Sequence, residues 1–265
     1  MLAVRRWIAD NWVMASGLFV LAYLFLPIAV VVALSFNRPS TRLSYDLNDF
    51  TLDNWRDPCG PAGLCDAVLR SIEIGLVTTV VATLLGTLMS FALVRHRFRG
   101  RSATNLLIFL PMATPEVVMG SSLLALFAAG QVQLGFWTVV VAHVMFCISF
   151  VVVTVKARLA GLDSRLEEAA MDLYANEWQT FRRITQPLVF PGILAAALLA
   201  FSLSFDDFII TNFNAGPTTI TFPMYVWGAA QRGIPPEVNV IGTAMFAVSF
   251  LLVVAAGARR RRVAS

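Results

Sequence analysis

The sequence predicts an all-α membrane protein with six transmembrane helices. Hydrophobic residues make up 58% of the chain and charged residues only 14%, and the mean hydropathy is +0.73, far from the values of soluble proteins. A helix crosses a bilayer with about 20 apolar residues, and six runs approach that length. These runs are continuously apolar and lack the period-two alternation of barrel strands. Helices are therefore favoured, because a helix satisfies its own backbone hydrogen bonds in lipid.

The apolar runs define the expected organisation of the chain. We divide it into residues 1–67 (N-terminal tail, first helix and outer loop), 68–257 (a core of five helices) and 258–265 (a basic tail). The first run is long for the apolar part of a secretion signal and has no convincing cleavage site, so we expect a retained anchor. The six predicted spans are approximately residues 14–36, 68–94, 103–129, 136–155, 188–213 and 238–257.

The distribution of basic residues predicts the orientation of these spans. If the N-terminus is cytoplasmic, fifteen of the 20 lysine and arginine residues fall on the inner side. This bias puts both termini in the cytoplasm. The run Arg259 to Arg262 is then a stop-transfer anchor near anionic lipid. Because membrane topology explains the net charge of +4, no nucleic-acid partner is predicted.

The three cysteines have different predicted environments. Cys59 and Cys65 lie in the first outward loop around a turn-rich stretch, where an oxidising compartment would allow a disulfide. Two free thiols remain the alternative, and the spacing does not resemble a zinc site. Cys147 falls within the fourth span and is expected to be a small buried apolar residue.

No catalytic or metal-binding pattern is evident in the sequence. The single lysine, Lys156, does not belong to a phosphate-binding G-x-x-x-x-G-K-[ST] loop. His96 and His143 are isolated from each other and match no helical zinc motif. We expect His143 to be a packing residue with one hydrogen bond. The chain is therefore predicted to be no enzyme and to hold no cofactor or metal of its own.

The longest inward loop, between the fourth and fifth spans, predicts two short helices along the cytoplasmic face. From Leu162 onward, apolar residues follow helical spacing while charged residues fill the other faces. Ser164 with Glu167, and Asn176 with Gln179, match capping boxes at the starts of the two helices. On periodicity alone, the simplest interpretation is a surface helix pair stabilised by its own charges.

Within this loop, Glu168-Ala169-Ala170 followed by Ile184 and Pro187 resembles the EAA signature of permease subunits of binding-protein-dependent ABC importers. The resemblance covers nearly the whole chain and implies the permease fold of type I ABC importers. In that family the loop forms a coupling helix that sits in a groove of the ATPase subunit. The resemblance thus gives an ATPase-coupling role to Glu168, Ala169, Ala170, Asp172, Tyr174, Ile184 and Pro187.

The sequence departs from the family signature at two positions. Tyr174 replaces the glycine of the family, and Gln186 replaces a leucine before the proline. Glycine would permit a left-handed residue between the short helices, whereas tyrosine disfavours that conformation. Either the turn is made differently, with Asn176 absorbing the bend, or docking is weaker.

Further motifs resemble the permeases of spermidine/putrescine importers, specifically the C-type subunit. They are Pro-Met-Ala-Thr-Pro-Glu at residues 111–116, Ser-Phe-Asp-Asp-Phe at 204–208, Gly216-Pro217, and Pro-Pro-Glu-Val-Asn at 235–239. The resemblance implies a bacterial inner-membrane protein that works with a second related permease, two ATPase subunits and an external solute-binding protein. ATP and magnesium would be bound by the ATPases.

Three acidic residues within the predicted spans suggest a route for a cation. An ionised carboxylate at a helix centre costs about 2.5–3.5 kcal/mol on insertion scales and usually faces protein or a wet cavity. Glu116 is expected near the midplane, with Asp206 and Asp207 toward the outer part of the fifth span. Alternatively, Glu116 holds free backbone N–H groups at a helix weakened by prolines. Adjacent helical positions point about 100° apart, so we expect one of the two aspartates to face the conduit while the other packs or caps.

Several functions remain open on the sequence alone. The favoured one is ATP-driven import of polyamines, with other small solutes (phosphonate, iron, or an amino acid-like compound) as alternatives. An ion-coupled secondary carrier would use Glu116 and Asp207 as relay carboxylates. A membrane scaffold without a pathway would need none of the acids.

Overall fold

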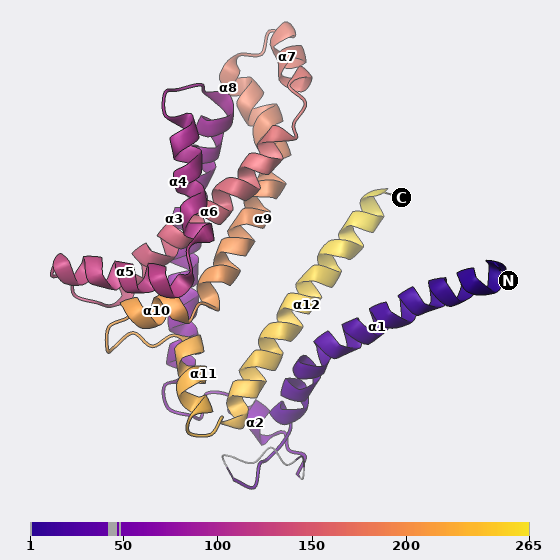
Figure 1. Cartoon of the computed structure of the whole chain (residues 1–265), viewed down its shortest axis with the longest axis vertical. Coiled ribbons are helices and arrows are strands. Elements are labelled where there is room, and N and C mark those ends of the chain that lie inside the picture. The colour runs from indigo at the N-terminus through magenta and orange to yellow at the C-terminus, as the bar shows by residue number, and fades with distance from the viewer. Residues whose placement is uncertain (1, 42–46, 48, 265) are drawn as a thin grey trace. The chain divides into compact units, whose positions relative to one another are not determined.

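A computed structural model describes residues 2–41, 47 and 49–264 (Figure 1). All regular elements in this part of the chain are helices, apart from an isolated bridge between Asn37 and Phe50. The prediction of an all-α protein is therefore confirmed. Side chains at 2–10, 252–253 and 255–264 lie outside the described residues, as do the basic groups near both ends that support the predicted orientation.

The order of elements follows the predicted apolar runs, with additional short helices between them. The elements are α1 (Leu2–Ser35), α2 (Asp53–Arg56), α3 (Leu64–Arg95), α4 (Arg101–Ala113), α5 (Glu116–Ala129), α6 (Phe136–Ala160), α7 (Arg165–Asp172), α8 (Glu177–Thr180), the π-helical turn η1 (Phe181–Thr185), α9 (Gln186–Phe205), α10 (Ile209–Asn214), α11 (Phe222–Ala230) and α12 (Pro236–Ala264).

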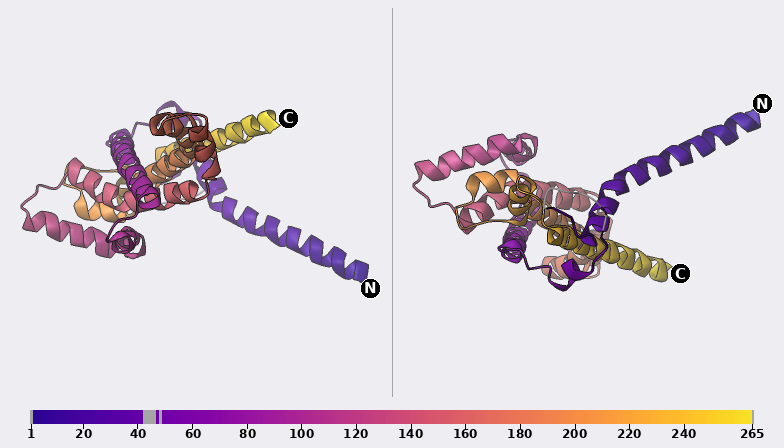
Figure 2. Two further views of the ribbon diagram at one scale, coloured as in Figure 1. Left: turned by 90° about the horizontal axis from the view of Figure 1, so that it is seen from above. Right: turned by 90° about the horizontal axis from the view of Figure 1, so that it is seen from below.

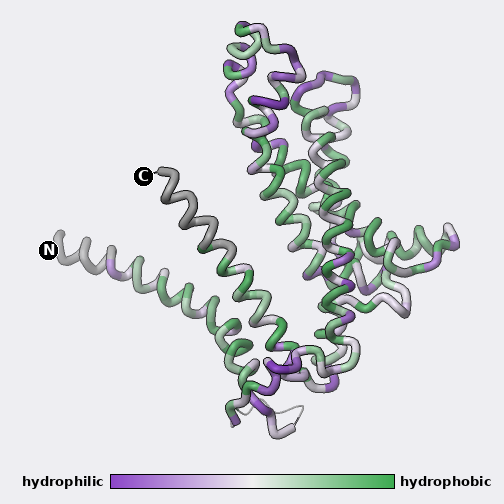
Figure 3. The backbone as a smooth tube through the Cα atoms, turned by 180° about the vertical axis from the view of Figure 1, so that it is seen from behind, coloured by the Kyte–Doolittle hydropathy of each residue, from purple (hydrophilic) through white to green (hydrophobic). Residues whose placement is uncertain are grey.

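Four helical stretches among the described residues are long and apolar enough to cross a membrane. They are Asn11–Ser35, Leu64–Arg95, Phe136–Ala160 and Glu177–Phe205. A fifth crossing is possible if α4 and α5 are counted together, and the described apolar part of α12 is the shorter stretch Pro236–Leu251. Figure 3 shows these stretches as mainly hydrophobic, with polar residues around α7 and α8, in the loop between α3 and α4, and near α2.

The third predicted span is not a straight helix. Between α4 and α5 the chain bends by 106°, because Thr114 is extended and Pro115 precedes the first residue of α5. Proline has no N–H to donate and disfavours helical geometry in the residue before it. Of the two prolines predicted to weaken this span, Pro115 lies at the break, whereas Pro111 is accommodated inside α4.

The fifth predicted span, residues 188–213, is also interrupted. α9 ends at Phe205, and α10 begins at Ile209 after a three-residue break. The apolar run continued through this break because phenylalanine and isoleucine surround the two aspartates. Hydropathy therefore did not reveal where the helix ends.

The described helices form two compact units. One comprises residues 66–225, and the other comprises residues 1–65 together with 226–265. In the second unit α12 packs against α1 and α2. The three-segment division predicted from the sequence follows apolar runs rather than packing, and it stays a prediction.

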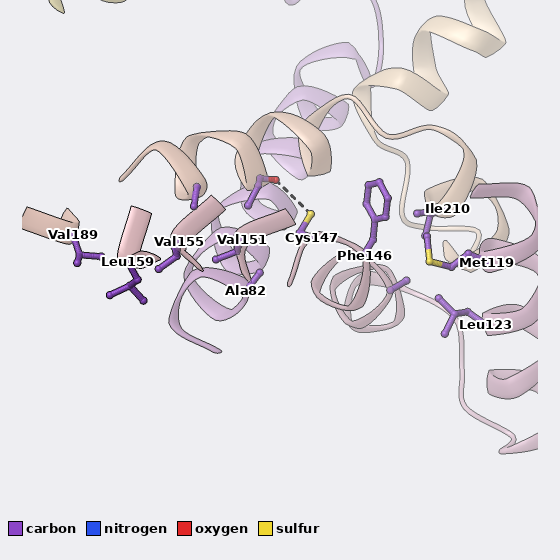
Figure 4. Packing of buried hydrophobic residues seen from close by; sticks show 13 residues of the cluster. Ala82, Met119, Leu123, Phe146, Cys147, Val151, Val155, Leu159, Val189 and Ile210 are labelled. Carbon is purple, nitrogen blue, oxygen red and sulfur yellow. Dashed lines mark hydrogen bonds between the residues drawn. The ribbon is translucent and has the colours of Figure 1, made fainter. Parts of the chain in front are cut away.

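The core of the first unit is built around α6. This helix packs against α9, α4 and α10, and its buried residues include Phe146, Cys147 and Val151 (Figure 4). Cys147 is fully buried, and its Sγ lies 3.6 Å from the carbonyl oxygen of Ala200. The expectation of a small buried apolar residue at this position is confirmed.

α3 and α6 approach closely at Gly86. A Cβ atom at this position would lie 2.6 Å from Cγ1 of Val151. One turn further along α3, the Ser90 hydroxyl donates to the Val152 carbonyl, at 3.1 Å. Because Gly86 has no side chain, α3 and α6 can approach more closely than a larger residue would allow.

The outer loop carries the two remaining cysteines. Cys59 and Cys65 are joined in a disulfide with Cα atoms 5.4 Å apart. Nearby, Phe36 stacks on Phe50 and on Trp55, with ring centroids 5.6 and 5.3 Å apart.

Replacing Gly86 with leucine should destabilise the protein by about 1–3 kcal/mol, the usual cost of overpacking. The matched control is Gly17→Leu in α1, where an added Cβ would meet no atom within 4 Å. Thermal unfolding in detergent, followed by tryptophan fluorescence, should show a lower melting temperature for Gly86→Leu only. Equal melting temperatures would contradict the close approach of α3 and α6.

Candidate functional site

The polar end of the first unit is formed by α7, α8 and η1. The predicted capping box at Ser164 and Glu167 is wrong. Ser164 has helical backbone angles and makes no side-chain cap, and Oδ1 of Asp163 accepts the N–H of Arg165 instead, at 3.0 Å. The Glu167 carboxylate is unavailable for capping because it is bound elsewhere.

Glu167 attaches α7 to two other elements. Both carboxylate oxygens accept from the guanidinium of Arg95 at the end of α3, and Oε1 also accepts from the hydroxyl of Thr185 in η1. The Glu167 side chain is only 14% exposed. We call these three residues the Glu167 clasp. Two-pronged bonds between arginine and carboxylate fix geometry as well as adding energy, so the clasp ties α7 to α3 and to the entry of α9.

The clasp also controls the ionisation of Glu167. Hydrogen bonding from Arg95, aided by Thr185, lowers the pKa of the Glu167 carboxyl despite the opposing effect of burial. A lowered pKa means that the contribution of the clasp to stability is complete above the ordinary pKa of glutamate and is lost as pH falls through the lowered value. At neutral pH the clasp is fully formed.

The turn after α7 is made by Tyr174 itself. This residue has a positive φ of 63°, in the left-handed region. The N–H of Ala175 donates to the carbonyl of Ala170 (3.0 Å), as expected of a helix that ends with a left-handed residue. Tyr174 is 98% exposed, so its ring meets no obstacle. Of the two alternatives for this turn, a bend at Asn176 is wrong, since Tyr174 adopts the conformation that glycine would supply; weaker docking stays a prediction.

Asn176 instead caps α8. Its Oδ1 accepts the N–H of Gln179 at 2.8 Å, and Oε1 of Gln179 accepts the N–H of Asn176 at 3.0 Å. The predicted capping box at this position is confirmed. Trp178 then stacks on Phe181 with ring centroids 5.7 Å apart.

The residues predicted to couple to an ATPase do not all face outward. Ala170 is buried and Ile184 is half-buried, whereas Glu168, Ala169, Asp172 and Pro187 are exposed.

Sequence reasoning missed other side chains on this surface. Leu173 is 81% exposed and Trp178 is 65% exposed, and exposed apolar groups at a polar end of a molecule are typical of protein contacts. We call the exposed side chains of Glu168, Ala169, Asp172, Leu173, Tyr174 and Trp178 the α7–α8 surface.

The predicted acids of the transport route lie at the two helix breaks. Glu116 is the first residue of α5, and Asp206 is the first residue after α9. Both are exposed in the single chain. Asp207 is different, because only 8% of its surface is exposed. The neighbouring aspartates therefore have different environments, as expected for adjacent positions.

Asp207 belongs to a buried network with His143 of α6. Its Oδ1 accepts the N–H and the hydroxyl of Thr211, at 2.8 and 3.0 Å, and lies 3.2 Å from His143 Nε2. The other ring nitrogen, Nδ1, lies 2.7 Å from the hydroxyl of Ser204. His143 thus bridges the end of α9 and the start of α10. The prediction of a packing histidine with one hydrogen bond is wrong, since both ring nitrogens have polar partners.

The two helix breaks are also joined to each other. α5 and α10 pack side by side (Figures 1 and 2). The side-chain amide of Asn214 donates to the Gly120 carbonyl at 3.3 Å, and Phe213 lies against Gly120. No sequence signal linked these segments, because the partners are 94 residues apart.

Discontinuous apolar helices are a feature of many membrane transport proteins. Residues 82–263 match the family described as "Binding-protein-dependent transport system inner membrane component". The chain belongs to this family of inner-membrane transport subunits, which confirms the family predicted from the EAA signature.

Two curated permease proteins are similar to this chain over most of its length. The chain is 38% identical over 235 residues to the spermidine/putrescine transport system permease protein PotC of Haemophilus influenzae, covering 89% of this chain and 91% of the relative. It is 35% identical over 243 residues to the putrescine transport system permease protein PotI of Escherichia coli K12, covering 89% and 86% of the two chains.

Solved structures share the fold. A bacterial ABC transporter that imports the acidic polysaccharide alginate matches with a TM-score of 0.70 and 14% identity, covering 99% of this chain and 100% of the other. The MetNI methionine ABC transporter matches with a TM-score of 0.58 and 14% identity, covering 76% and 96%. At this identity the likeness concerns fold alone, and it confirms the ABC importer permease fold.

Replacing Glu167 with glutamine should loosen α7, because the clasp loses its charge while the side-chain volume is kept. Glu168→Gln is the matched control, since Glu168 is exposed and has the same chemistry. Hydrogen bonds to charged groups contribute about 1.5–3 kcal/mol, so amide exchange in residues 165–172 should accelerate about tenfold or more in Glu167→Gln. Similar exchange rates in the two variants would show that the clasp does not hold α7.

Proposed function

We propose that this chain is a transmembrane permease subunit of an ATP-driven importer of polyamines such as spermidine and putrescine. The observation that carries this proposal is the 38% identity, over 89% of the chain, to permeases named for spermidine/putrescine transport. The chain supplies part of the transport pathway. ATP hydrolysis, with its magnesium, takes place in separate ATPase subunits.

The assembly we propose contains a second related permease, two ATPase subunits and an external solute-binding protein. One structure with the same fold is of an alginate ABC transporter in complex with a periplasmic protein bound to an alginate pentasaccharide, which supports a partner of this kind. Both termini lie in the cytoplasm of a bacterial cell in this proposal, on the same side as the α7–α8 surface. The disulfide between Cys59 and Cys65 then lies on the external side, which suits an oxidising compartment.

The α7–α8 surface docks into the ATPase subunit. Glu168, Ala169, Asp172 and Tyr174 contact the partner directly, while Ala170 packs beneath them. Ile184 and Pro187 set the entry into α9. Movement of the ATPase reaches the membrane helices through the Glu167 clasp, because this contact joins α7 to α3 and to η1.

Changing Glu168 and Ala169 together to lysine should uncouple transport from ATP hydrolysis. Both side chains are exposed, so insertion should be normal, whereas reversed charge and added bulk weaken docking. The matched control is Glu168→Gln with Ala169→Ser. We expect uptake into vesicles to fall about tenfold or more, equivalent to about 1.4 kcal/mol of lost interaction, and to stay near normal in the control. Undiminished uptake by the lysine variant would argue against docking at this surface.

Glu116, Asp206 and Asp207 serve a cation route, with distinct roles. Glu116 and Asp206 are exposed at the helix breaks and can attract a dication directly. Asp207 already accepts hydrogen bonds from Thr211 and contacts His143, so it shapes the break rather than meeting the solute. Two carboxylates at separate breaks suit a substrate with separated positive charges.

Asparagine substitutions distinguish these roles. Asp206→Asn removes one attractive charge and should raise the KM for putrescine several-fold with little change in Vmax. Asp207→Asn weakens the buried network, at a cost of about 1–3 kcal/mol, and should lower both Vmax and the melting temperature. Uptake assays with radiolabelled putrescine measure both parameters. An unchanged KM in Asp206→Asn would remove this residue from the route.

An ion-coupled carrier is not supported, because the chain belongs to a family of binding-protein-dependent transport components. Identification of the solute is a separate question. The radiolabelled compound retained by the cognate external binding protein identifies it, and retention of a phosphonate or iron instead of a polyamine would overturn the polyamine assignment while leaving the importer intact.

A further inference from the structure

A groove between α4 and α6 lies outside the coupling surface and the acidic route. It has a volume of about 250 Å³. Its walls are almost entirely apolar, including Ile108 and Phe109 of α4 and Val152 and Val153 of α6, and its polar groups are Asn105 and Lys156. None of the functions proposed above uses this groove.

Lys156 is an unusual residue in this place. It is the only lysine of the chain, and it lies within α6, four residues before the end of the helix at Ala160. The side chain is half-buried, and its Nζ donates to Oδ1 of Asn105 at 2.7 Å. No ion pair of Lys156 with a carboxylate occurs among the described residues. A cation inside a membrane helix normally has an anionic partner or a wet cavity.

Extension of the side chain toward water would be the simplest explanation of a lysine near a helix end. The contact with Asn105 opposes that explanation, because it holds the ammonium at the groove. Asn105 is itself fixed, since its amide donates to the Arg101 carbonyl at 3.0 Å. An ammonium has three donors, and Asn105 takes one. Two donors are therefore left for a ligand of the groove.

The polarity of the groove runs along the helices. Lys156 is about 6 Å from the end of α6, at 1.5 Å per residue, so it lies near the headgroup region when this end of α6 is at a membrane surface. Ile108, Phe109 and Val152 lie about one turn deeper toward the middle of the span. A positive group at the surface with apolar walls below matches the distribution of charge and hydrocarbon in an anionic phospholipid. Basic pockets between membrane helices bind such headgroups.

We propose that the α4–α6 groove binds an anionic phospholipid, with the phosphate on Lys156 and Asn105 and the upper part of an acyl chain along Ile108, Phe109 and Val152. The lipid phosphate supplies the negative charge opposite the Lys156 ammonium, with which no described carboxylate forms an ion pair. The proposal is independent of the transported solute. It requires only that this end of α6 lies at a membrane surface.

The test uses the complete transporter in nanodiscs that contain phosphatidylglycerol with a photoreactive acyl chain. Mass spectrometry should find the label on residues 105–109 and 152–157. Lys156→Gln should reduce this label about fivefold, the equivalent of roughly 1 kcal/mol per basic residue, and Lys156→Arg should retain it. The matched control is Arg99→Gln, which removes an exposed charge from the loop before α4 and should change the label less than about twofold.

A second variant fills the groove without removing the charge. Ala157 lines the groove and is exposed, so Ala157→Phe should displace the label even if Lys156→Gln folds poorly. Three results would overturn the proposal: equal labelling by photoreactive phosphatidylcholine, undiminished labelling in both Lys156→Gln and Ala157→Phe, or crosslinking of the groove to the second permease in place of lipid.

Discussion

The buried contact between His143 and Asp207 is the interaction on which the membrane part of this protein depends. A backbone that leaves helical geometry within an apolar run frees polar groups that lipid cannot satisfy. Around the break after α9, the Asp207 carboxylate accepts the N–H of Thr211, and His143 joins Ser204 to Thr211 from the neighbouring helix. Without these partners the break would leave unsatisfied polar groups in a low-dielectric setting.

This network explains why one aspartate of the pair is exposed and the other is not. Asp207 organises α10, and α10 in turn packs against α5, where the first break lies. Glu116 and Asp206 are consequently presented at the ends of packed helices rather than along a smooth channel wall. Asp207 satisfies backbone groups at the break, whereas contact with the solute is the role proposed for Glu116 and Asp206.

In the proposed mechanism, movement of the ATPase subunit is transmitted from the α7–α8 surface to these breaks. α7 is short, and eight residues cannot form a stable helix without tertiary contacts. The Glu167 clasp supplies such contacts on one side, and Ala170 packs on the same side. The opposite side remains free for a partner. α6 carries both ends of this connection, since His143 of the buried network lies in its first half and Lys156 lies near its last residue.

Much of this architecture could be predicted from local sequence. Long apolar runs indicated α1, α3 and α6, and the Asn176–Gln179 pair indicated the start of α8, because each pattern depends only on neighbouring residues. The left-handed Tyr174 could not be predicted, since its propensity opposes that conformation and the bond from the N–H of Ala175 to the carbonyl of Ala170 is visible only in the folded turn. The role of Glu167 was also missed, because Arg95 lies 72 residues away and its position depends on how α3 meets α7.

The sequence by itself determined that the chain is a helical membrane protein, that a loop carries the EAA signature, and that acidic residues lie in apolar surroundings. Hydropathy and short motifs determine these features because both are local properties. Only the tertiary structure decided where two of the apolar runs break, which aspartate is buried, and which glutamate attaches α7 to the rest of the unit. Those outcomes depend on contacts between residues from 61 to 94 positions apart. Helix packing selects such contacts, and no local pattern records them.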